Sequence, residues 1–281
     1  MLKPKVFLRM ILLCLISGGL LVSCEDVINV KLQDASPRLV VEGRISNISD
    51  SVKIMLHKST DYFSPKNIVS VTNGTVSISD SQGNSYLLSN NLNGIYSVTN
   101  FTPKPGGSYT LKVTADGVNY TASTVMPYLV KIDSLIIDKN PERPKENRIN
   151  IIFKDPAGIP NYYQVKVFKN GSLLNNNNHI ALYSDKYIDG KAVIITINAR
   201  RLDITRFEVN DTVKVQLINI DKMMYDYYQI LRDITDEGNF ILASSPSNPP
   251  NNLDHGALGY FTALSVYEQS IIVKGMRTSR H

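Results

Sequence analysis

Hydrophobic and polar residues alternate with a period of two over most of the first half of the chain. Val52, Ile54 and Leu56 alternate with residues that we expect to face solvent, and residues 108–116 repeat the pattern up to an Asp-Gly turn signal. This alternation is typical of strands with one buried face and one solvated face, and the Asp-Gly pair favours a hairpin. We therefore predict about seven short strands and an antiparallel β-sandwich over residues 38–128.

The second half of the chain returns to the same pattern after a charged, proline-bearing stretch. Residues 138–148 predict a surface loop, because charged residues and prolines occur there without an apolar face. Beyond this stretch, apolar residues recur at every second position in several segments: 149–153, 162–169, 192–199 and 212–219. These segments predict a second sandwich over residues 129–281.

One segment of the second half has a helical period instead. Met223 and Tyr227 lie on one stripe, which Met224 and Tyr228 widen. We predict one amphipathic helix at about 221–236, packed on the second sheet. The expected fold class is therefore mainly β, with two tandem β-sandwich domains of the immunoglobulin or fibronectin type and one helix in the second.

The N-terminal residues predict a leader that is removed. Residues 1–9 are basic, and residues 10–22 are apolar or small over a length too short for a stable membrane span of about 20 residues. The letters LVSC that follow resemble a bacterial lipobox. This resemblance implies a signal peptide at 1–23, cleavage between Ser23 and Cys24, and a diacylglycerol thioether on Cys24 that binds membrane lipid without spanning the bilayer.

Charge and cysteine content add no further chemistry. Of the 30 Lys and Arg residues, three lie in the leader, which leaves 27 basic and 25 acidic residues after cleavage. A nucleic-acid partner is not expected, because such binding requires clustered basic residues. Cys14 is removed with the leader and Cys24 is modified, so the mature domains have no thiol or disulfide. Residues 24–37 form the lipidated tether.

Several segments resemble one known family. The segments LVVEGRIS and FKDPAG, the letters YDYY at 225–228 and the letters NPPNNLDHGALGYF at 248–261 are similar to the Bacteroidota lipoprotein family catalogued as domain of unknown function 4249. The resemblance implies an outer-membrane location and a TonB-dependent receptor as a partner, and it carries over no catalytic residue. Glu25 and Asp26, directly after Cys24, resemble a surface-export signal of this phylum and imply a position facing the cell exterior.

The sequence shows no catalytic pattern. It contains no HExxH, GxSxG or P-loop motif, and none of its four histidines has the spacing of a zinc ligand. Asp185 and Asp189 flank Tyr187, but they do not fit a calcium loop of the EF-hand type. We therefore expect no metal, no cofactor and no enzymatic activity. A carboxylate pair for glycan hydrolysis is set by spatial rather than sequential spacing, so it stays open.

Four residues are candidates for ligand contact. Tyrosine offers a flat ring with a polar tip, which suits sugars and peptides. Tyr162, Tyr163 and Tyr225 are the tyrosine candidates, although either Tyr162 or Tyr163 must face the interior of a strand pair. His255 is the fourth candidate, because it stands beside Asp254 in a glycine-rich loop.

Three residues are candidates for O-glycosylation. Members of this phylum modify Asp-Ser or Asp-Thr followed by an aliphatic residue, and this pattern selects Ser51, Ser134 and Thr212. The same dipeptides are also ordinary turn residues.

These observations predict a surface-exposed outer-membrane lipoprotein that acts as a non-enzymatic accessory or ligand-capture partner of a TonB-dependent transporter. The first alternative is a structural or adhesive envelope protein, and the second is a glycan-active hydrolase.

Overall fold

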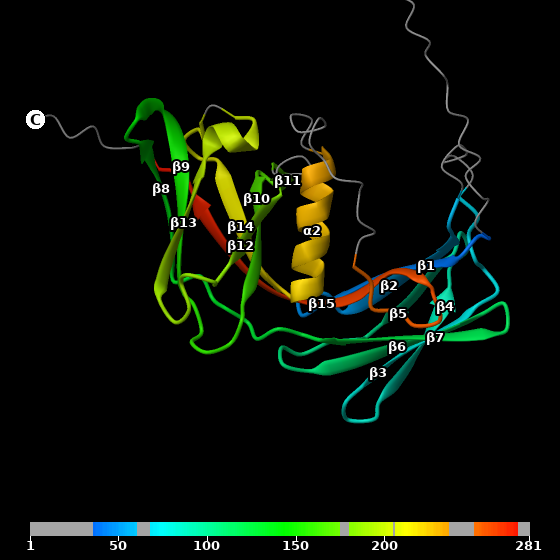
Figure 1. The fold of residues 1–281 in the computed structure, drawn as a ribbon. Helices are drawn as coiled ribbons and strands as arrows, with labels where there is room; N and C mark the ends of the chain where they lie inside the picture. Colours follow the sequence, from blue (N-terminus) through cyan, green and yellow to red (C-terminus); the bar gives the residue numbers. More distant parts are fainter. Residues whose placement is uncertain (1–35, 61–67, 175–179, 205, 236–249, 275–281) are drawn as a thin grey trace, which may run out of the picture. The chain divides into compact units, whose positions relative to one another are not determined.

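The computed structural model describes residues 36–60, 68–174, 180–204, 206–235 and 250–274 (Figure 1). Ser23, Cys24 and the predicted leader lie outside the described residues, as do Glu25 and Asp26. Within these described residues the fold is mainly β with one α-helix, as the alternation and the helical period predicted. Among the described helices, none is both long enough and apolar enough to cross a bilayer.

The first sandwich contains two facing sheets. Its strands are β1 (Leu39–Ser46), β2 (Ser51–Lys58), β3 (Thr75–Asp80), β4 (Ser85–Asn90), β5 (Ile95–Thr99), β6 (Ser108–Ala115) and β7 (Val118–Val125). One sheet has the order β1-β2-β5, and the other has the order β4-β3-β6-β7. Strand β4 pairs with β3 through residues 85–88 and with β5 through residues 89–90, so it passes from one sheet to the other.

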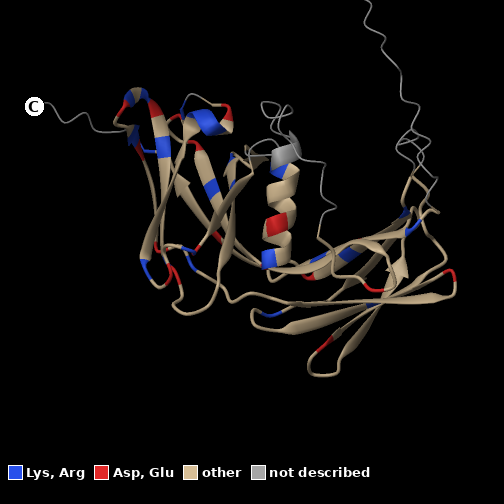
Figure 2. Ribbon diagram, viewed as in Figure 1, with Lys and Arg blue, Asp and Glu red and all other residues tan. Residues whose placement is uncertain are grey.

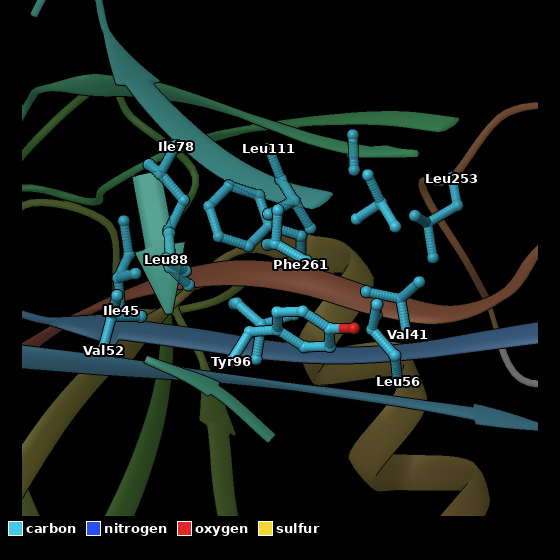
Figure 3. Close-up of a cluster of buried hydrophobic side chains, with 14 of the residues drawn as sticks. Val41, Ile45, Val52, Leu56, Ile78, Leu88, Tyr96, Leu111, Leu253 and Phe261 are labelled. Carbon is cyan, nitrogen blue, oxygen red and sulfur yellow. The ribbon is translucent and has the colours of Figure 1, made fainter. Parts of the chain in front are cut away.

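Alternate residues of these strands form the core of the first sandwich. Figure 3 shows this core, with labels on Val41, Ile45, Val52, Leu56, Ile78, Leu88, Tyr96, Leu111, Leu253 and Phe261. Tyr96 is buried, and its hydroxyl donates to the carbonyl of Val71 at 3.0 Å and accepts from the N–H of Gly74 at 2.9 Å. The polar tip of this ring is therefore satisfied inside the core.

The second sandwich also contains two sheets. Its strands are β8 (Ser134–Asn140), β9 (Arg143–Lys154), β10 (Tyr162–Lys169), β11 (Ser172–Leu173), β12 (Ala181–Ser184), β13 (Ala192–Asn198), β14 (Thr212–Ile220) and part of β15 (Leu258–Ile272), with a short 3-10 helix, η2 (Ala199–Leu202). The first sheet has the order β13-β9-β8, and in the second sheet β10 pairs with β14 and β14 with β15. Ile151 and Phe153 of one sheet and Val165 and Leu217 of the other are completely buried in one core cluster.

The prediction of a surface loop at 138–148 is wrong, because this stretch forms the hairpin of β8 and β9. Arg148 lies opposite Asp138 in the pairing register, and its Nε donates to the Asp138 carboxylate at 2.7 Å. Asn150 donates to the same carboxylate at 3.2 Å. Cross-strand pairs of opposite charge stabilise a hairpin. The charged residues that led to the prediction of a loop therefore stabilise these two strands.

Strand β15 belongs to both sandwiches. Its residues 258–264 pair in parallel with β1, and its residues 265–272 pair antiparallel with β14. Leu253 and Ala257, just before the strand, are buried in the first core. The predicted division into 38–128 and 129–281 therefore fails for residues 251–264, which complete the first sandwich. Parallel pairing between segments over 200 residues apart leaves no local signal in the sequence.

Gly259 lets β15 approach β1. Its φ is +97°, and a Cβ at this position would lie 2.0 Å from the carbonyl oxygen of Val41. Any side chain would therefore collide with the backbone of β1. Gly256 has a similar φ of +73°, but a Cβ there would meet nothing within 4 Å.

We predict that Gly259→Ala lowers the free energy of unfolding by about 2–4 kcal/mol, because it adds a backbone collision to the strain of a positive φ. Gly256→Ala is the matched control and should cost about 1 kcal/mol, from backbone strain alone. Urea unfolding of the full chain measures both values. Equal losses in the two variants would contradict the close approach of β15 to β1.

Candidate functional site

Helix α2 (Lys222–Thr235) covers part of the outer face of the second sheet of the second sandwich. It packs in a third hydrophobic cluster, whose buried members are Ile180, Ile218, Ile220, Met224, Tyr228, Tyr260, Leu264 and Val266. Met224 and Tyr228 are its most buried side chains, whereas Met223 and Tyr227 are half-buried. The helix is thus where the pattern predicted it, but the centre of its buried stripe is shifted by one residue. Its predicted last residue, 236, lies outside the described residues.

Asp221 caps the start of α2. Its Oδ1 accepts the N–H of Met224 at 2.7 Å, and its Oδ2 accepts the hydroxyl of Thr262, on β15, at 3.2 Å. A carboxylate at this position satisfies a free N–H group of the first helical turn. Burial raises the pKa of Asp221 above its ordinary value, although these hydrogen bonds act in the opposite direction. Asp221 therefore connects the start of α2 to β15. The carboxylate is partly desolvated in this position, which disfavours its charged form.

Aromatic rings and one arginine gather where α2 lies beside β15 and β1. We call this group the tyrosine face, and its members are Arg44, Tyr162, Tyr225, Tyr227, Tyr228 and Tyr260. A guanidinium nitrogen of Arg44 donates to the Tyr260 hydroxyl at 3.2 Å. The Tyr227 and Tyr260 rings are 5.3 Å apart, and the Tyr162 and Tyr225 rings are 5.0 Å apart. Each distance is in the range of a favourable aromatic pair.

A second basic side chain, Lys166, lies close enough to Arg44 for their charges to interact. Burial lowers the pKa of Lys166, and the nearby charge of Arg44 lowers it further. Burial also raises the pKa values of Tyr227 and Tyr228, so both hydroxyls stay protonated at neutral pH and can donate hydrogen bonds. The tyrosine face thus combines flat apolar rings with cationic and neutral donors.

A shallow hollow of about 190 Å³ adjoins the tyrosine face. Its lining includes Glu42, Arg44, Lys53, Met55 and Tyr260. Glu42 is the sole carboxylate among the residues that line it, whereas hydrolysis of a glycosidic bond generally uses two carboxyl groups. The lining, which also includes the apolar residues Met55 and Ile95, supplies no such pair.

The structure brings two of the four predicted ligand contacts together. The rings of Tyr162 and Tyr225 contact each other at a tilt of 42° in the tyrosine face, and each residue is half-buried. The prediction for Tyr163 is wrong, because its side chain is completely buried on the opposite face of β10. Its hydroxyl donates to Asp155, and burial, followed by this hydrogen bond, raises the pKa of the phenol.

His255 lies apart from the tyrosines, in the turn between Leu253 and Ala257. Its ring meets Tyr120 edge-on at 6.4 Å, and its Nδ1 lies 3.1 Å from Asp254. Asp254 accepts the N–H and the hydroxyl of Thr121 on β7, at 2.7 and 2.5 Å, and these bonds lower its pKa to about 2. This turn is therefore fixed to the first sandwich by Asp254, and His255 projects from it with an exposed side chain.

The three O-glycosylation candidates lie at the starts of strands. Ser51 begins β2 and Ser134 begins β8, and both are half-buried, whereas Thr212 begins β14 and is exposed. The carboxylate of Asp211, beside Thr212, accepts from Lys169 at 2.9 Å and from Asn170 at 2.8 Å. This aspartate thus has a structural role in the turn.

Sequence reasoning missed two features of the site. Arg44 and Tyr260 are neighbours only because β15 pairs with β1, and no local pattern predicts that pairing. Asp155, Asp185 and Asp189 also come together, with carboxylate oxygens within 4.8 Å of one another. The sequence indicated no metal site, because Asp155 lies in the β9–β10 loop, far in the chain from Asp185 and Asp189 in the β12–β13 loop.

Comparison with known proteins gives one family and a distant likeness of fold. A family model described as "Domain of unknown function (DUF4249)" matches residues 25–270. No curated protein matches the chain.

Two solved structures resemble part of the chain. One is a two-domain fibronectin type-III segment from chicken tenascin, with 10% identity, a TM-score of 0.20, and coverage of 65% of this chain and 90% of that segment. The other is the adhesin InvE of Yersinia pseudotuberculosis, with 16% identity, a TM-score of 0.22, and coverage of 65% of this chain and 56% of the adhesin. Neither likeness bears on function, because the identities and TM-scores are both low.

We predict that Asp221→Ala lowers the free energy of unfolding by about 1 kcal/mol, through loss of the helix cap. Asp221→Asn keeps the capping oxygen and removes the buried charge, so at pH 7 it should be at least as stable as the wild type.

The pH dependence separates the charge from the cap. Because the folded-state pKa of Asp221 is raised, its contribution to stability is fully present below its ordinary pKa of about 3.9 and is lost as the pH rises through the raised value. The stability of Asp221→Asn relative to the wild type should therefore grow between about pH 4 and pH 7. Urea unfolding at each pH gives this difference, and a constant difference would contradict a desolvated charge at the cap.

Proposed function

The chain belongs to the DUF4249 family, and from this premise we propose that it is a lipid-anchored, non-enzymatic protein of the outer membrane. In this proposal Cys24 carries the lipid, the two sandwiches face the cell exterior, and the tyrosine face captures a ligand for a TonB-dependent transporter.

The tyrosine face is the observation that carries the proposal. Four separate elements supply it: Arg44 comes from β1, Tyr162 from β10, Tyr260 from β15 and the other three tyrosines from α2. Tyrosine and arginine are enriched among residues that dominate binding energy, since they combine a large contact area with directed hydrogen bonds. A face built on paired strands and a capped helix loses little conformational entropy when a ligand binds.

The extent of the family match supports the lipid anchor. The match begins at residue 25, directly after Cys24, and continues through both sandwiches. A family domain that starts beside the lipobox cysteine fits a mature protein whose N-terminal residue is that cysteine. Two acyl chains are enough for stable anchoring, because each buried methylene contributes about 0.8 kcal/mol.

One observation favours a second candidate function, in envelope structure or adhesion. Strand β15 pairs within both sandwiches, so its backbone joins them without a flexible linker. Such a continuous connection suits a spacer that transmits force. A deletion strain with normal nutrient uptake and altered attachment would favour this candidate over ligand capture.

We predict that Cys24→Ala abolishes lipid attachment. Mass spectrometry of the N-terminal peptide should find acyl chains on Cys24 of the wild type and an uncleaved, unmodified leader in the variant. Ser49→Ala, in a short turn of the first sandwich, is a control that leaves processing intact. Fully processed Cys24→Ala protein that still needs detergent for extraction would contradict the anchor.

We also predict that the wild-type protein co-purifies with a β-barrel transporter from gently solubilised membranes.

We further predict that Arg44→Ala impairs uptake of the ligand through that transporter. In a deletion strain, Arg44→Ala should restore uptake through that transporter at least about tenfold less well than the wild type, as expected of a binding hot spot. Lys112→Ala removes an exposed charge on β6 and should restore uptake fully. Full uptake with Arg44→Ala would contradict ligand capture at the tyrosine face.

A further inference from the structure

Four loop residues meet at one end of the second sandwich. Asp155 follows β9, Asn161 precedes β10, Asp185 follows β12 and Asp189 precedes β13. Figure 1 shows these strand ends at the same end of the sandwich, and Figure 2 shows acidic positions gathered there. Carboxylate oxygens of the three aspartates lie within 4.8 Å of one another. We call these four residues the loop cluster.

Two of the carboxylates in the loop cluster are buried without a cationic partner. Asp155 is 1% exposed and Asp185 is 8% exposed. Asp155 accepts from the Tyr163 hydroxyl and from the N–H of Gly190 at 3.0 Å, so its donors are neutral. No ion pair among the described residues includes an aspartate of the cluster. Buried carboxylates that face one another repel, and a nearby cation relieves this repulsion.

Backbone N–H groups hold two of the three carboxylates, Asp185 and Asp189, in place. Asp185 accepts the N–H of Asn161 at 2.7 Å, and Asp189 accepts the N–H of Gly158 at 2.7 Å. Each of these bonds occupies one oxygen of a carboxylate that has two. The remaining lone pairs of the cluster are thus free for a further ligand.

Asn161 adds an independent observation. Its side chain is only 7% exposed, and its Oδ1 is buried without a hydrogen-bond partner. The N–H of Asp185 donates to the Asn161 carbonyl at 3.1 Å, which extends the β10–β12 register by one pair beyond Tyr162 and Ser184. Directly opposed residues project to the same face of a sheet. The unpartnered oxygen of Asn161 is therefore directed to the same side as the Asp185 carboxylate and Tyr163, whose hydroxyl reaches Asp155.

We propose that the loop cluster binds a calcium ion through Asp155, Asp185, Asp189 and the Oδ1 of Asn161. Calcium prefers six to eight oxygen ligands at about 2.3–2.6 Å, so oxygens on opposite sides of the ion are about 4.6–5.2 Å apart. One carboxylate oxygen from each aspartate lies within 4.8 Å of the others, which is close enough for all three to reach one ion. Magnesium would require opposed oxygens about 4.0–4.2 Å apart and a stricter octahedral arrangement. Because the ligands come from separate loops, the ion would bind these loops to one another.

The first experiment uses the purified full chain in detergent, freed of metal with EDTA. Calcium at about ten times its dissociation constant should raise the melting temperature by about 3–6 °C, and the same concentration of magnesium should raise it much less. Terbium, a calcium substitute, should luminesce when the tyrosines are excited, because the Tyr163 phenol is hydrogen-bonded to Asp155, a ligand of the ion. No shift and no luminescence, or an equal shift with magnesium, would overturn the proposal.

Variants assign the effect to the loop cluster. Asp189→Asn changes the exposed member, keeps an oxygen for Gly158 and should fold normally, but it should weaken calcium binding at least tenfold. Asp116→Asn makes the same substitution in an exposed turn and should keep the full calcium shift. Asn161→Ala should also weaken binding and lower the terbium signal. A full calcium shift in Asp189→Asn would overturn the assignment.

Discussion

The backbone pairing of β15 is the constraint on which the rest of the structure depends. One strand gives its hydrogen bonds first to β1 and then to β14, with the change of partner between Leu264 and Ser265. The first sandwich therefore needs a segment from the far end of the chain to complete its sheet and its core. Gly259 makes the approach possible, since the carbonyl of Val41 occupies the space that a side chain would fill.

The same pairing creates the tyrosine face. Tyr260 lies next to Arg44 because β15 and β1 run side by side, and the capped start of α2 places Tyr227 against Tyr260. The rings are therefore held by a sheet and a helix rather than by loops. Such a face is preorganised, because the side chains already occupy the positions in which they would meet a ligand. The loop cluster, by contrast, lies where four strand ends meet, and its geometry depends on loops that are short and bonded to one another.

The sequence predicted the strands and the helix in which the pattern of neighbouring residues indicates the buried face. Alternation identified the strands of the first sandwich, and a period of 3.6 identified α2, because in both cases neighbouring residues report which face is buried. The sequence-based prediction was wrong at residues 138–148, because charged residues that are typical of a loop pair with each other across a hairpin there. It also placed residues 251–264 in the wrong sandwich, since long-range parallel pairing leaves no periodic trace. Within the site, the sequence required either Tyr162 or Tyr163 to face inward, but the choice depends on the strand's register. Asp155 went unnoticed because it is 30 positions from Asp185 in the chain and meets it only through folding.

The first sandwich is synthesised before the second, but it cannot complete its fold until a segment near the end of the chain has been synthesised. Residues 38–128 leave the ribosome early, yet their sheet and core stay incomplete until residues 251–264 have been synthesised. Contacts of such long sequence separation form slowly, because a large loop must close before they yield any stabilisation. The first module therefore completes its fold only when β15 is available, and this one strand consolidates both modules together.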